Sequence, residues 1–348
     1  MRVLFAGSPA IAVPSLRAVS EMEGEGRGVA LAGILTNPDR ARRHGHDEPT
    51  DVSAAASALD ALRQQRGLPA LPQLKPERLD APAREAVAAL APDLLVTFAY
   101  GRIFGPRFLA LFPLGGININ PSLLPCYRGA APLPAAILAR EKETGICIQT
   151  LAPEMDAGDL LVTERFELSG RETTASLSET VSQKAAVLLH NLLADFAAAR
   201  AAARPQQGQA SYCHQIKKEA GTINWTQSAA EIDAQIRAYT PWPLSFTRLG
   251  DDTLFILEAR PLPPGAQSFA PSATPPRLCE IKDAAMPARA ASPPGAVLGT
   301  DRENGILIQT GSGVLAVSRL QWQAKKPLVW KAFCNGARDF TGRVLGAG

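Results

Sequence analysis

Two polar segments of this chain combine residue types that could do chemistry. The first, at residues 115–132, reads GGININPSLLPCYRGAAP, and its Asn118 and Asn120 alternate with isoleucines. A period of two puts both amide side chains on one face of a short strand. The second is the turn MDAGD at residues 155–159, whose Asp156 could order a water or tune a neighbouring proton acceptor. Taken singly, these residues are better explained as turn formers, but together they indicate a ligand site.

The loop that follows the first segment's strand suits ligand binding. Residues 121–125, PSLLP, contain two prolines with fixed φ angles. The run Gly129, Ala130 and Ala131 offers small residues and free backbone N–H groups before a helix, which suits a flat ligand or an anionic group. In open α/β sheets, ligands bind just outside the carboxyl ends of the strands, where this loop should lie.

The elements that must position these residues alternate between strand and helix. Continuous apolar runs suit strands that are covered on both faces, as in a parallel sheet. The predicted strands are residues 2–6, 29–35, 93–99, 117–120, 145–152 and 160–166, and the predicted helices are residues 11–19, 53–66, 131–140 and 174–203. This pattern predicts that residues 1–203 form an α/β domain with a mostly parallel, twisted sheet.

A second domain is predicted after a break at residues 204–210, which we interpret as a linker. Residues 211–348 hold one amphipathic helix, at 229–239, and short strands with Gly-rich turns, which suggest a small barrel. Residues 261–294 are rich in Pro, Ala and Ser, and we expect a flexible insertion between barrel strands there.

The composition argues against several classes of protein. No apolar stretch approaches the roughly 20 residues that span a bilayer, and the start MRVLFAG indicates a strand rather than a secretion signal. The five cysteines are widely spaced without a C-x-x-C pair, so neither disulfides nor a metal site is expected. Residues 206–348 carry 15 Lys and Arg against 11 Asp and Glu, giving +4, while the remainder is −1. This excess hints at a polyanionic partner, although chance composition explains it about as well.

The chain resembles the methionyl-tRNA formyltransferase family nearly from end to end. The matching motifs are FAGSP, TNPDR, FAYG, SLLP with YRGAAP, DAGD and, beyond the predicted linker, INW and YTPWP. The middle motif is shared by the wider 10-formyltetrahydrofolate transferases, and the later motifs point to the tRNA enzyme. The resemblance implies a Rossmann-like catalytic domain, an OB-like barrel, 10-formyltetrahydrofolate as formyl donor, no metal, and initiator methionyl-tRNA as acceptor. We expect a cytoplasmic monomer that does not associate with membranes.

The resemblance also places catalytic residues. It puts the family's Asn on Asn118 and its Asp on Asp156, whereas its His falls on Asn120. Acyl transfer needs hydrogen-bond donors to the developing oxyanion and a route for the amine proton, and an amide can donate but cannot exchange a proton near pH 7. Losing acid–base assistance costs roughly 10²–10⁴ in rate. We therefore expect a slowed site, or one in which water and Asp156 share the proton transfer.

Substrate contacts are expected in three places. The resemblance implies folate contacts at Ser122, Leu123, Leu124 and Pro125, where a pteridine would find an apolar slot with backbone hydrogen-bonding groups. It implies tRNA contacts in the basic loop at residues 40–46, and the lysines of the second domain could follow phosphates. The expected tRNA contacts are Arg40, Arg42, Arg43, Lys217, Lys218, Lys325 and Lys326. For residues 122–125 the alternative is a loop that only packs against the core. For the basic residues the alternative is a solvated surface without a partner.

Two other functions fit the sequence less well. A formyltransferase for a small amine, such as glycinamide ribonucleotide or an amino sugar, would not need a barrel with basic patches. A catalytically impaired tRNA- or folate-binding homologue would explain Asn120. Against it, residues 122–125 and 128–131 are retained together with Asn118 and Asp156, and an unused site has no physical requirement to keep that set.

Overall fold

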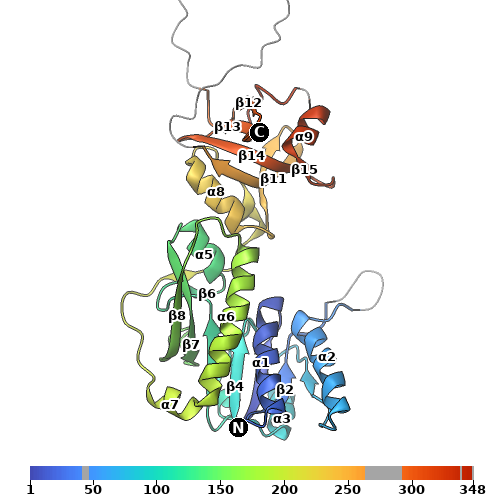
Figure 1. The fold of residues 1–348 in the computed structure, drawn as a ribbon, viewed down its shortest axis with the longest axis vertical. Helices are drawn as coiled ribbons and strands as arrows, with labels where there is room; N and C mark the ends of the chain where they lie inside the picture. Colours follow the sequence, from blue (N-terminus) through green and yellow to red (C-terminus); the bar gives the residue numbers. More distant parts are fainter. Residues whose placement is uncertain (41–46, 263–291, 338, 347–348) are drawn as a thin grey trace, which may run out of the picture. The chain divides into compact units, whose positions relative to one another are not determined.

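The chain forms two compact units, Met1–Gln215 and Ile216–Gly348 (Figure 1). The computed structural model describes residues 1–40, 47–262, 292–337 and 339–346. By this division, residues 204–210, where the sequence predicts a linker, belong to the first unit. Most of the insertion predicted at residues 261–294 lies outside the described residues.

The first unit is built on a seven-stranded sheet with the strand order β3-β2-β1-β4-β5-β7-β8. The strands are β1 (Arg2–Gly7), β2 (Ala30–Leu35), β3 (Gln73–Leu74), β4 (Leu94–Phe98), β5 (Gly116–Asn120), β7 (Glu143–Thr150) and β8 (Leu160–Glu167). The first five strands in this order, β3-β2-β1-β4-β5, are parallel, whereas β7 pairs antiparallel with both β5 and β8. The residues of β4 are all buried, as a continuous apolar run predicts. The predicted α/β fold with a mostly parallel sheet is confirmed.

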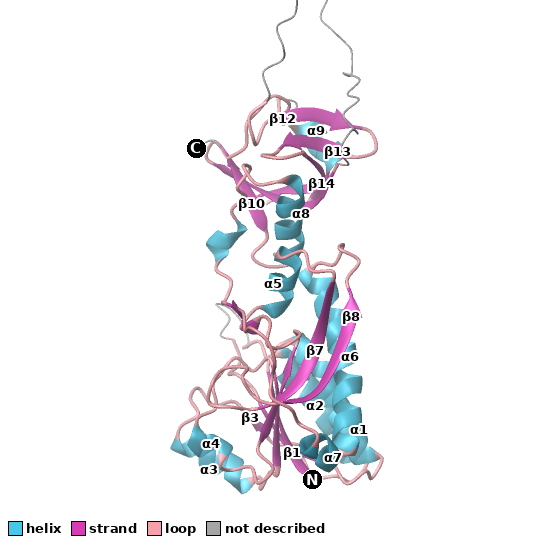
Figure 2. Cartoon of the chain, turned by 90° about the vertical axis from the view of Figure 1, so that its left-hand side faces the viewer, coloured by secondary structure: helices cyan, strands magenta, loops and turns pink. Residues whose placement is uncertain are grey.

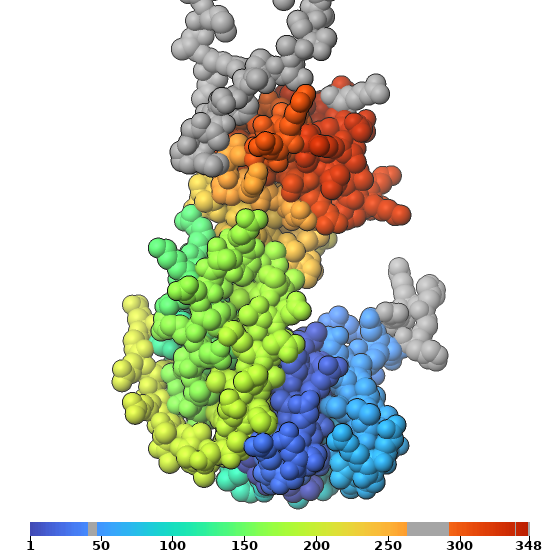
Figure 3. Space-filling view, in the orientation of Figure 1, coloured from blue at the N-terminus to red at the C-terminus, as the bar shows by residue number. Residues whose placement is uncertain are grey.

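Helices cover both faces of this sheet. Figure 2 shows α1, α2 and α6 on one side and α3 and α4 on the other. The helices are α1 (Val13–Gly24), α2 (Asp51–Gln65), α3 (Ala81–Ala89), α4 (Pro106–Leu109), α5 (Pro132–Leu138), α6 (Thr174–Ala194) and α7 (Phe196–Ala201), with a 3-10 turn, η1, at Ala10–Ala12. In Figure 3 the blue surface of α1 lies beside the green surface of α6. Thr50 caps α2 and Thr173 caps α6 by accepting from backbone N–H groups, which fixes where both helices begin.

The helix predicted at residues 174–203 is interrupted, and the prediction of one continuous helix is wrong. Asp195 leaves the helical conformation, with φ −139° and ψ 62°, and its side chain accepts a hydrogen bond from the N–H of Ala198. A short acidic side chain competes with the helix for backbone groups and starts a new helix instead. Of the helices in the described ranges, none is both long enough and apolar enough to cross a membrane.

The second unit is an antiparallel sheet with the order β10-β11-β14-β13-β12, and β15 pairs with β14. Its elements are η2 (Lys218–Gly221), α8 (Ala229–Ala238), β10 (Ser245–Leu249), β11 (Asp252–Pro261), β12 (Val297–Asp301), β13 (Gly305–Gln309), β14 (Val314–Trp322), β15 (Leu328–Val329) and α9 (Trp330–Gly336). Ser228 and Glu231 form a capping box at the start of α8. The predicted second domain of short strands is confirmed as an antiparallel sheet, and α8 matches the predicted helix, whereas α9 is a further helix that the sequence did not predict.

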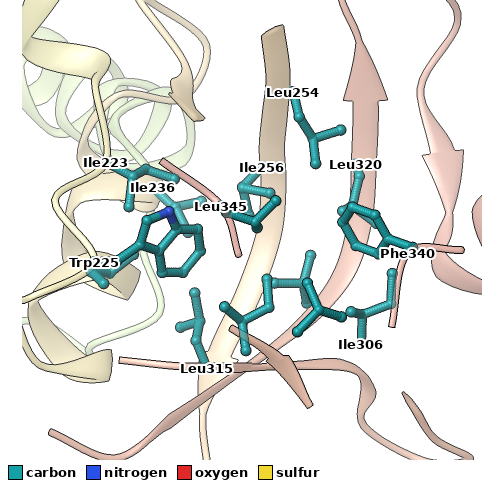
Figure 4. Packing of buried hydrophobic residues seen from close by; sticks show 14 of the residues in the cluster. Ile223, Trp225, Ile236, Leu254, Ile256, Ile306, Leu315, Leu320, Phe340 and Leu345 are labelled. Carbon is teal, nitrogen blue, oxygen red and sulfur yellow. The ribbon is translucent and has the colours of Figure 1, made fainter. Parts of the chain in front are cut away.

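The main core of the second unit is a cluster of aliphatic and aromatic side chains from α8, the sheet and the C-terminal segment (Figure 4). A smaller cluster, formed by Leu307, Val314 and Ala316, lies apart from it. Trp225 lies in the main core with 5% of its surface exposed. Its indole Nε1–H donates to Thr247 Oγ1 of β10 at 3.0 Å. A buried indole N–H needs such an acceptor, so this bond fixes the segment that precedes α8 against the sheet.

Candidate active site

The carboxylate of Asp156 is the point at which the two polar segments meet. Its Oδ1 accepts hydrogen bonds from Asn118 Nδ2 at 3.3 Å and from Gln149 Nε2 at 3.1 Å. Its Oδ2 accepts from the backbone N–H of Gly129 at 2.8 Å. The three donors come from β5, β7 and the short strand β6 (Arg128–Gly129). The structure therefore brings Asn118 and Asp156 together, as the sequence predicts, and adds two further donors.

The acidic turn is held in an unusual backbone conformation. Asp156 has φ +53°, in the left-handed region that Asp tolerates better than most residues. The Thr150 N–H donates to the carbonyl of Asp159 at 2.9 Å, and the Asp159 N–H donates to Thr150 Oγ1 at 2.9 Å. A Cβ at Gly158 would lie 1.7 Å from the Thr150 carbonyl oxygen. The turn closes this tightly only because residue 158 is glycine.

The Arg128–Gly129 segment approaches Asp156 because the end of the first unit returns to it. Strand β6 pairs in parallel with β9 (Tyr212–Cys213). Gly129 has φ +116°, and a Cβ there would lie 2.2 Å from the carbonyl oxygen of Cys213. This close approach aims the Gly129 N–H at the carboxylate. The small residues of the YRGAAP motif thus provide a backbone N–H donor, as the sequence suggests. The acceptor of this N–H is the protein's own Asp156 carboxylate rather than a ligand.

Asn120 does not share the hydrogen bonds of the Asn118–Asp156 pair. Its side chain is 3% exposed, and its Oδ1 accepts from Ser122 Oγ at 3.0 Å. Among the described residues, no hydrogen bond joins Asn120 to Asn118 or to Asp156. By contrast, Asn118 and Asp156 are only half-buried and remain reachable from solvent. Position 120 is therefore next to the pair along β5 without being connected to it.

The loop at residues 122–125 lies directly after β5. Ser122 Oγ lies 3.0 Å from Asn120 Oδ1 and 2.8 Å from the carbonyl of Cys126, and these two acceptors share its single hydroxyl hydrogen, which closes the loop. The side chains of Ser122, Leu124 and Pro125 are buried in the protein itself, whereas Leu123 is half-buried. The expected apolar slot is thus only partly open, because one of its three apolar side chains retains accessible surface.

The residues predicted to contact tRNA are exposed wherever they are described. Arg40 exchanges two backbone hydrogen bonds of 2.9 Å with Glu48, which closes the base of the basic loop. Arg42 and Arg43 lie outside the described residues. Lys217, Lys218, Lys325 and Lys326 are all exposed. Within the described ranges none of these four lysines forms a salt bridge.

Burial alters the proton affinity of the Cys213 thiol, which lies in β9, and of the Tyr127 hydroxyl, which comes directly before β6. It raises the pKa of the Cys213 thiol, and the negative charge of Asp156 adds to that increase. Burial also raises the pKa of Tyr127, whose hydroxyl donates to Glu141 Oε1 at 2.5 Å. Neither group is therefore placed to exchange a proton near neutral pH.

Two residues of the site were missed by the sequence analysis. Gln149 is 1% exposed on β7, and a polar residue inside an apolar strand needs a buried partner, which is the signal that could have found it. Gln206 donates to the backbone carbonyl of Asp156 at 2.8 Å, although it lies in the predicted linker. Its sequence surroundings, Pro and Gln next to Gly, carry no such signal.

Comparisons with known proteins identify relatives of both units. The family described as formyl transferase matches residues 1–193, and the one described as formyl transferase, C-terminal domain, matches residues 215–338. The chain is 45% identical over 342 residues to the methionyl-tRNA formyltransferase of Treponema denticola, covering 98% of each protein.

Two solved structures share the fold. One is WlaRD, a sugar 3N-formyl transferase determined in the presence of dTDP and 5-N-formyl-THF, with a TM-score of 0.58 at 15% identity, covering 94% of this chain and 99% of that one. The other is the methionyl-tRNA formyltransferase of Clostridium thermocellum, with a TM-score of 0.50 at 15% identity, covering 74% and 92% of the two chains.

Proposed function

The chain belongs to the methionyl-tRNA formyltransferase family, which uses formyltetrahydrofolate as formyl donor, and on that premise we propose that formyl transfer to methionyl-tRNA takes place at Asn118 and Asp156. The membership favours the tRNA enzyme over the small-amine alternative. The observation that supports this location is the shared hydrogen bond of the pair, at the carboxyl end of β5, in a half-buried position.

Asn118 supplies a hydrogen bond to the formyl oxygen as negative charge develops there. Its Nδ2 carries two hydrogens, and one of them is directed at Asp156 Oδ1. The other can point to a bound carbonyl. Because the contact to Asp156 fixes the amide plane, this donor is oriented before the substrate arrives. One such donor is worth roughly 2.7–4 kcal/mol in the transition state.

Asp156 assists the removal of the amine proton. Its two carboxylate oxygens have about four acceptor positions, and three are used by Asn118, Gln149 and Gly129. The remaining position, on Oδ2, can hold a water that takes the proton from the attacking amine. Asn120 cannot replace that water, since an amide does not take up a proton near pH 7.

The loop at residues 122–125 contributes backbone groups and one side chain to the folate site. A pteridine requires apolar surface and hydrogen-bonding groups at its edge. Leu123 offers the apolar surface, because it is the half-buried member of the loop, while Ser122, Leu124 and Pro125 hold the loop in place from within the protein. The residues present therefore fit a bound pteridine, with the backbone rather than Ser122 Oγ as its polar partner.

The exposed basic residues form the tRNA contacts. Arg40, together with Arg42 and Arg43 beyond the described residues, meets the acceptor end, while Lys217, Lys218, Lys325 and Lys326 follow the phosphates. Each phosphate contact should contribute to the salt dependence of binding. Replacing one lysine by Ala should weaken tRNA binding and make it less sensitive to salt. An unchanged salt slope in all four lysine variants would count against this surface.

The protein works as a monomer in the cytoplasm, with initiator methionyl-tRNA as its acceptor. Reduced, widely spaced cysteines support a cytoplasmic location, and the four described cysteines are free thiols. Light scattering coupled to size exclusion should give a mass near 36.8 kDa. A doubled mass at micromolar concentration would overturn the monomer.

A transfer assay with matched variants tests the reaction centre. The wild type, Asn118→Ala and Asp156→Ala are compared in formyl transfer from 10-formyltetrahydrofolate to methionyl-tRNA. We expect each variant to lose roughly 10²–10³ in kcat. Asp159→Ala is the control, because Asp159 lies in the same turn with an exposed side chain. Equal activity of Asp156→Ala and Asp159→Ala would refute the proposal.

A further inference from the structure

We infer that Gln206 is a positioning residue for the proposed reaction, because its carboxamide holds both the Asp156 turn and the amide that donates to the Asp156 carboxylate. The inference rests on the proposed function, in which Asp156 assists the proton transfer. It assigns a catalytic contribution to a segment that the sequence predicts to be a linker.

The carboxamide of Gln206 is bonded at both ends. Its Nε2 lies 2.8 Å from the carbonyl oxygen of Asp156, 2.9 Å from that of Gly158 and 3.0 Å from Oε1 of Gln149. Its Oε1 accepts from Arg128, at 3.2 Å from Nε and 2.6 Å from one terminal nitrogen. Gln149 in turn donates to Asp156 Oδ1. Four side chains thus form one hydrogen-bonded chain.

The direction of this chain is fixed by its ends. The guanidinium of Arg128 can only donate, and the carboxylate of Asp156 accepts. Gln206 must therefore turn its oxygen to Arg128 and its nitrogen to Gln149. Gln149 must then turn its nitrogen to Asp156. If either amide flipped, a donor would face a donor or an acceptor would face an acceptor. The hydrogen-bonded chain of side chains therefore has a single arrangement.

This arrangement acts on Asp156 in two ways. Gln206 holds the carbonyls on either side of Ala157, and so fixes a turn whose Asp156 has φ +53°. Through Gln149 it also orients the donor on Oδ1. In a site with Asn120 where the family carries His, the carboxylate position decides where the proton-accepting water sits. An error of about 1 Å in such a position can cost roughly 100-fold in rate.

The sharpest variant is Gln206→Glu, which keeps the size of the side chain and an oxygen towards Arg128. It replaces the donating nitrogen by an oxygen that faces three acceptor oxygens. We expect kcat to fall roughly 10- to 100-fold, with KM for both substrates within about twofold, because all polar atoms of Gln206 are bonded within the protein. Gln206→Met removes the bonds of the nitrogen and also the bond to Arg128, without adding a charge, and it covers the case in which Gln206→Glu does not fold.

Gln207→Glu is the matched control. Gln207 is the next residue, its side chain is exposed, and it makes no side-chain hydrogen bond within the described ranges. This variant adds the same charge one position away and should keep wild-type kinetics. Thermal melting of all variants shows whether any loss of rate comes from unfolding.

A double-mutant cycle separates positioning from general support of the structure. In the Asp156→Ala background, Gln206→Glu should cause no further loss in single-turnover rate, since the group that it positions is gone. An equal loss in both backgrounds, or wild-type kinetics of the Gln206 variants, would overturn the inference alone. If Asp156→Ala itself kept full activity, the proposed reaction centre would fail, and the inference with it.

Discussion

Asn118 and Gln149 lie directly opposite each other in the β5–β7 ladder, and the side-chain amides of both donate to the same oxygen, Oδ1 of Asp156. The register of this antiparallel pair therefore determines the site. A slip by one residue would turn one of the two amides to the other face of the sheet. The proposed reaction centre is built into the sheet rather than carried by loops alone, which keeps its donors rigid.

Replacing Asn120 by His should raise turnover. The imidazole would restore a group that exchanges protons near neutral pH, and acid–base assistance is worth roughly 10²–10⁴ in rate. Since only the neutral imidazole accepts a proton, the rate of Asn120→His should fall as the pH drops below its pKa. Rate–pH profiles measure this, with Asn120→Gln as a control for side-chain size. Identical profiles for wild type and Asn120→His would show that position 120 does not limit the rate.

Replacing Gly158 by Ala should destabilise the first unit and impair the site. The new Cβ would lie 1.7 Å from the Thr150 carbonyl, so the turn must move. We expect a cost of about 1–3 kcal/mol, typical of overpacking, together with a loss of turnover. Urea unfolding followed by circular dichroism measures the cost. Gly105→Ala is the control, because a Cβ there meets nothing within 4 Å. Similar stability of the two variants would argue against the tight turn.

The reactivity of Cys213 should report the charge of Asp156. Burial and the Asp156 carboxylate both raise the pKa of this thiol, so it should stay protonated and react slowly with iodoacetamide at pH 8. In Asp156→Asn the charge is lost, the pKa should fall, and the thiolate fraction and alkylation rate at Cys213 should rise. Mass spectrometry of the labelled peptide follows this. Asp159→Asn should leave the rate unchanged, and an equal rise in both variants would contradict the assignment.

Replacing Thr247 by Val should destabilise the second unit. The substitution keeps the shape of the side chain but leaves the buried indole N–H of Trp225 without its acceptor, at a cost of about 1–3 kcal/mol. All four tryptophans of the chain lie in this unit, so their fluorescence during urea unfolding reports its stability. Thr300→Val, at an exposed strand position, is the control. A midpoint equal to that of the control would mean that the bond contributes nothing.

Much of the fold could be predicted because its signals are local. Apolar runs located β4, β5, β7 and β8 to within two residues, and the family motifs led to Asn118 and Asp156. Asp195 shows the limit: its helical surroundings favour a continuous helix, and only the tertiary structure reveals that it acts as a cap.

The rest of the site depends on contacts between distant segments. Gln149 faces Asp156 only because β5 and β7 pair antiparallel in one register. Gln206 is 50 residues from Asp156 in sequence, within a segment that carries no periodic pattern. The loop at residues 122–125 has the composition of an apolar slot, yet composition alone could not tell that Leu124 would pack into the protein itself.

The parallel pairing of β6 with β9 has a practical consequence for anyone who wishes to excise the catalytic half of this chain. A cut at residue 193 or 203 would keep the whole central sheet. It would nevertheless discard the returning strand that shapes Gly129, as well as the carboxamide beneath Asp156. The smallest fragment that keeps the proposed reaction centre intact must extend at least through Cys213, well beyond the last helix of the first unit.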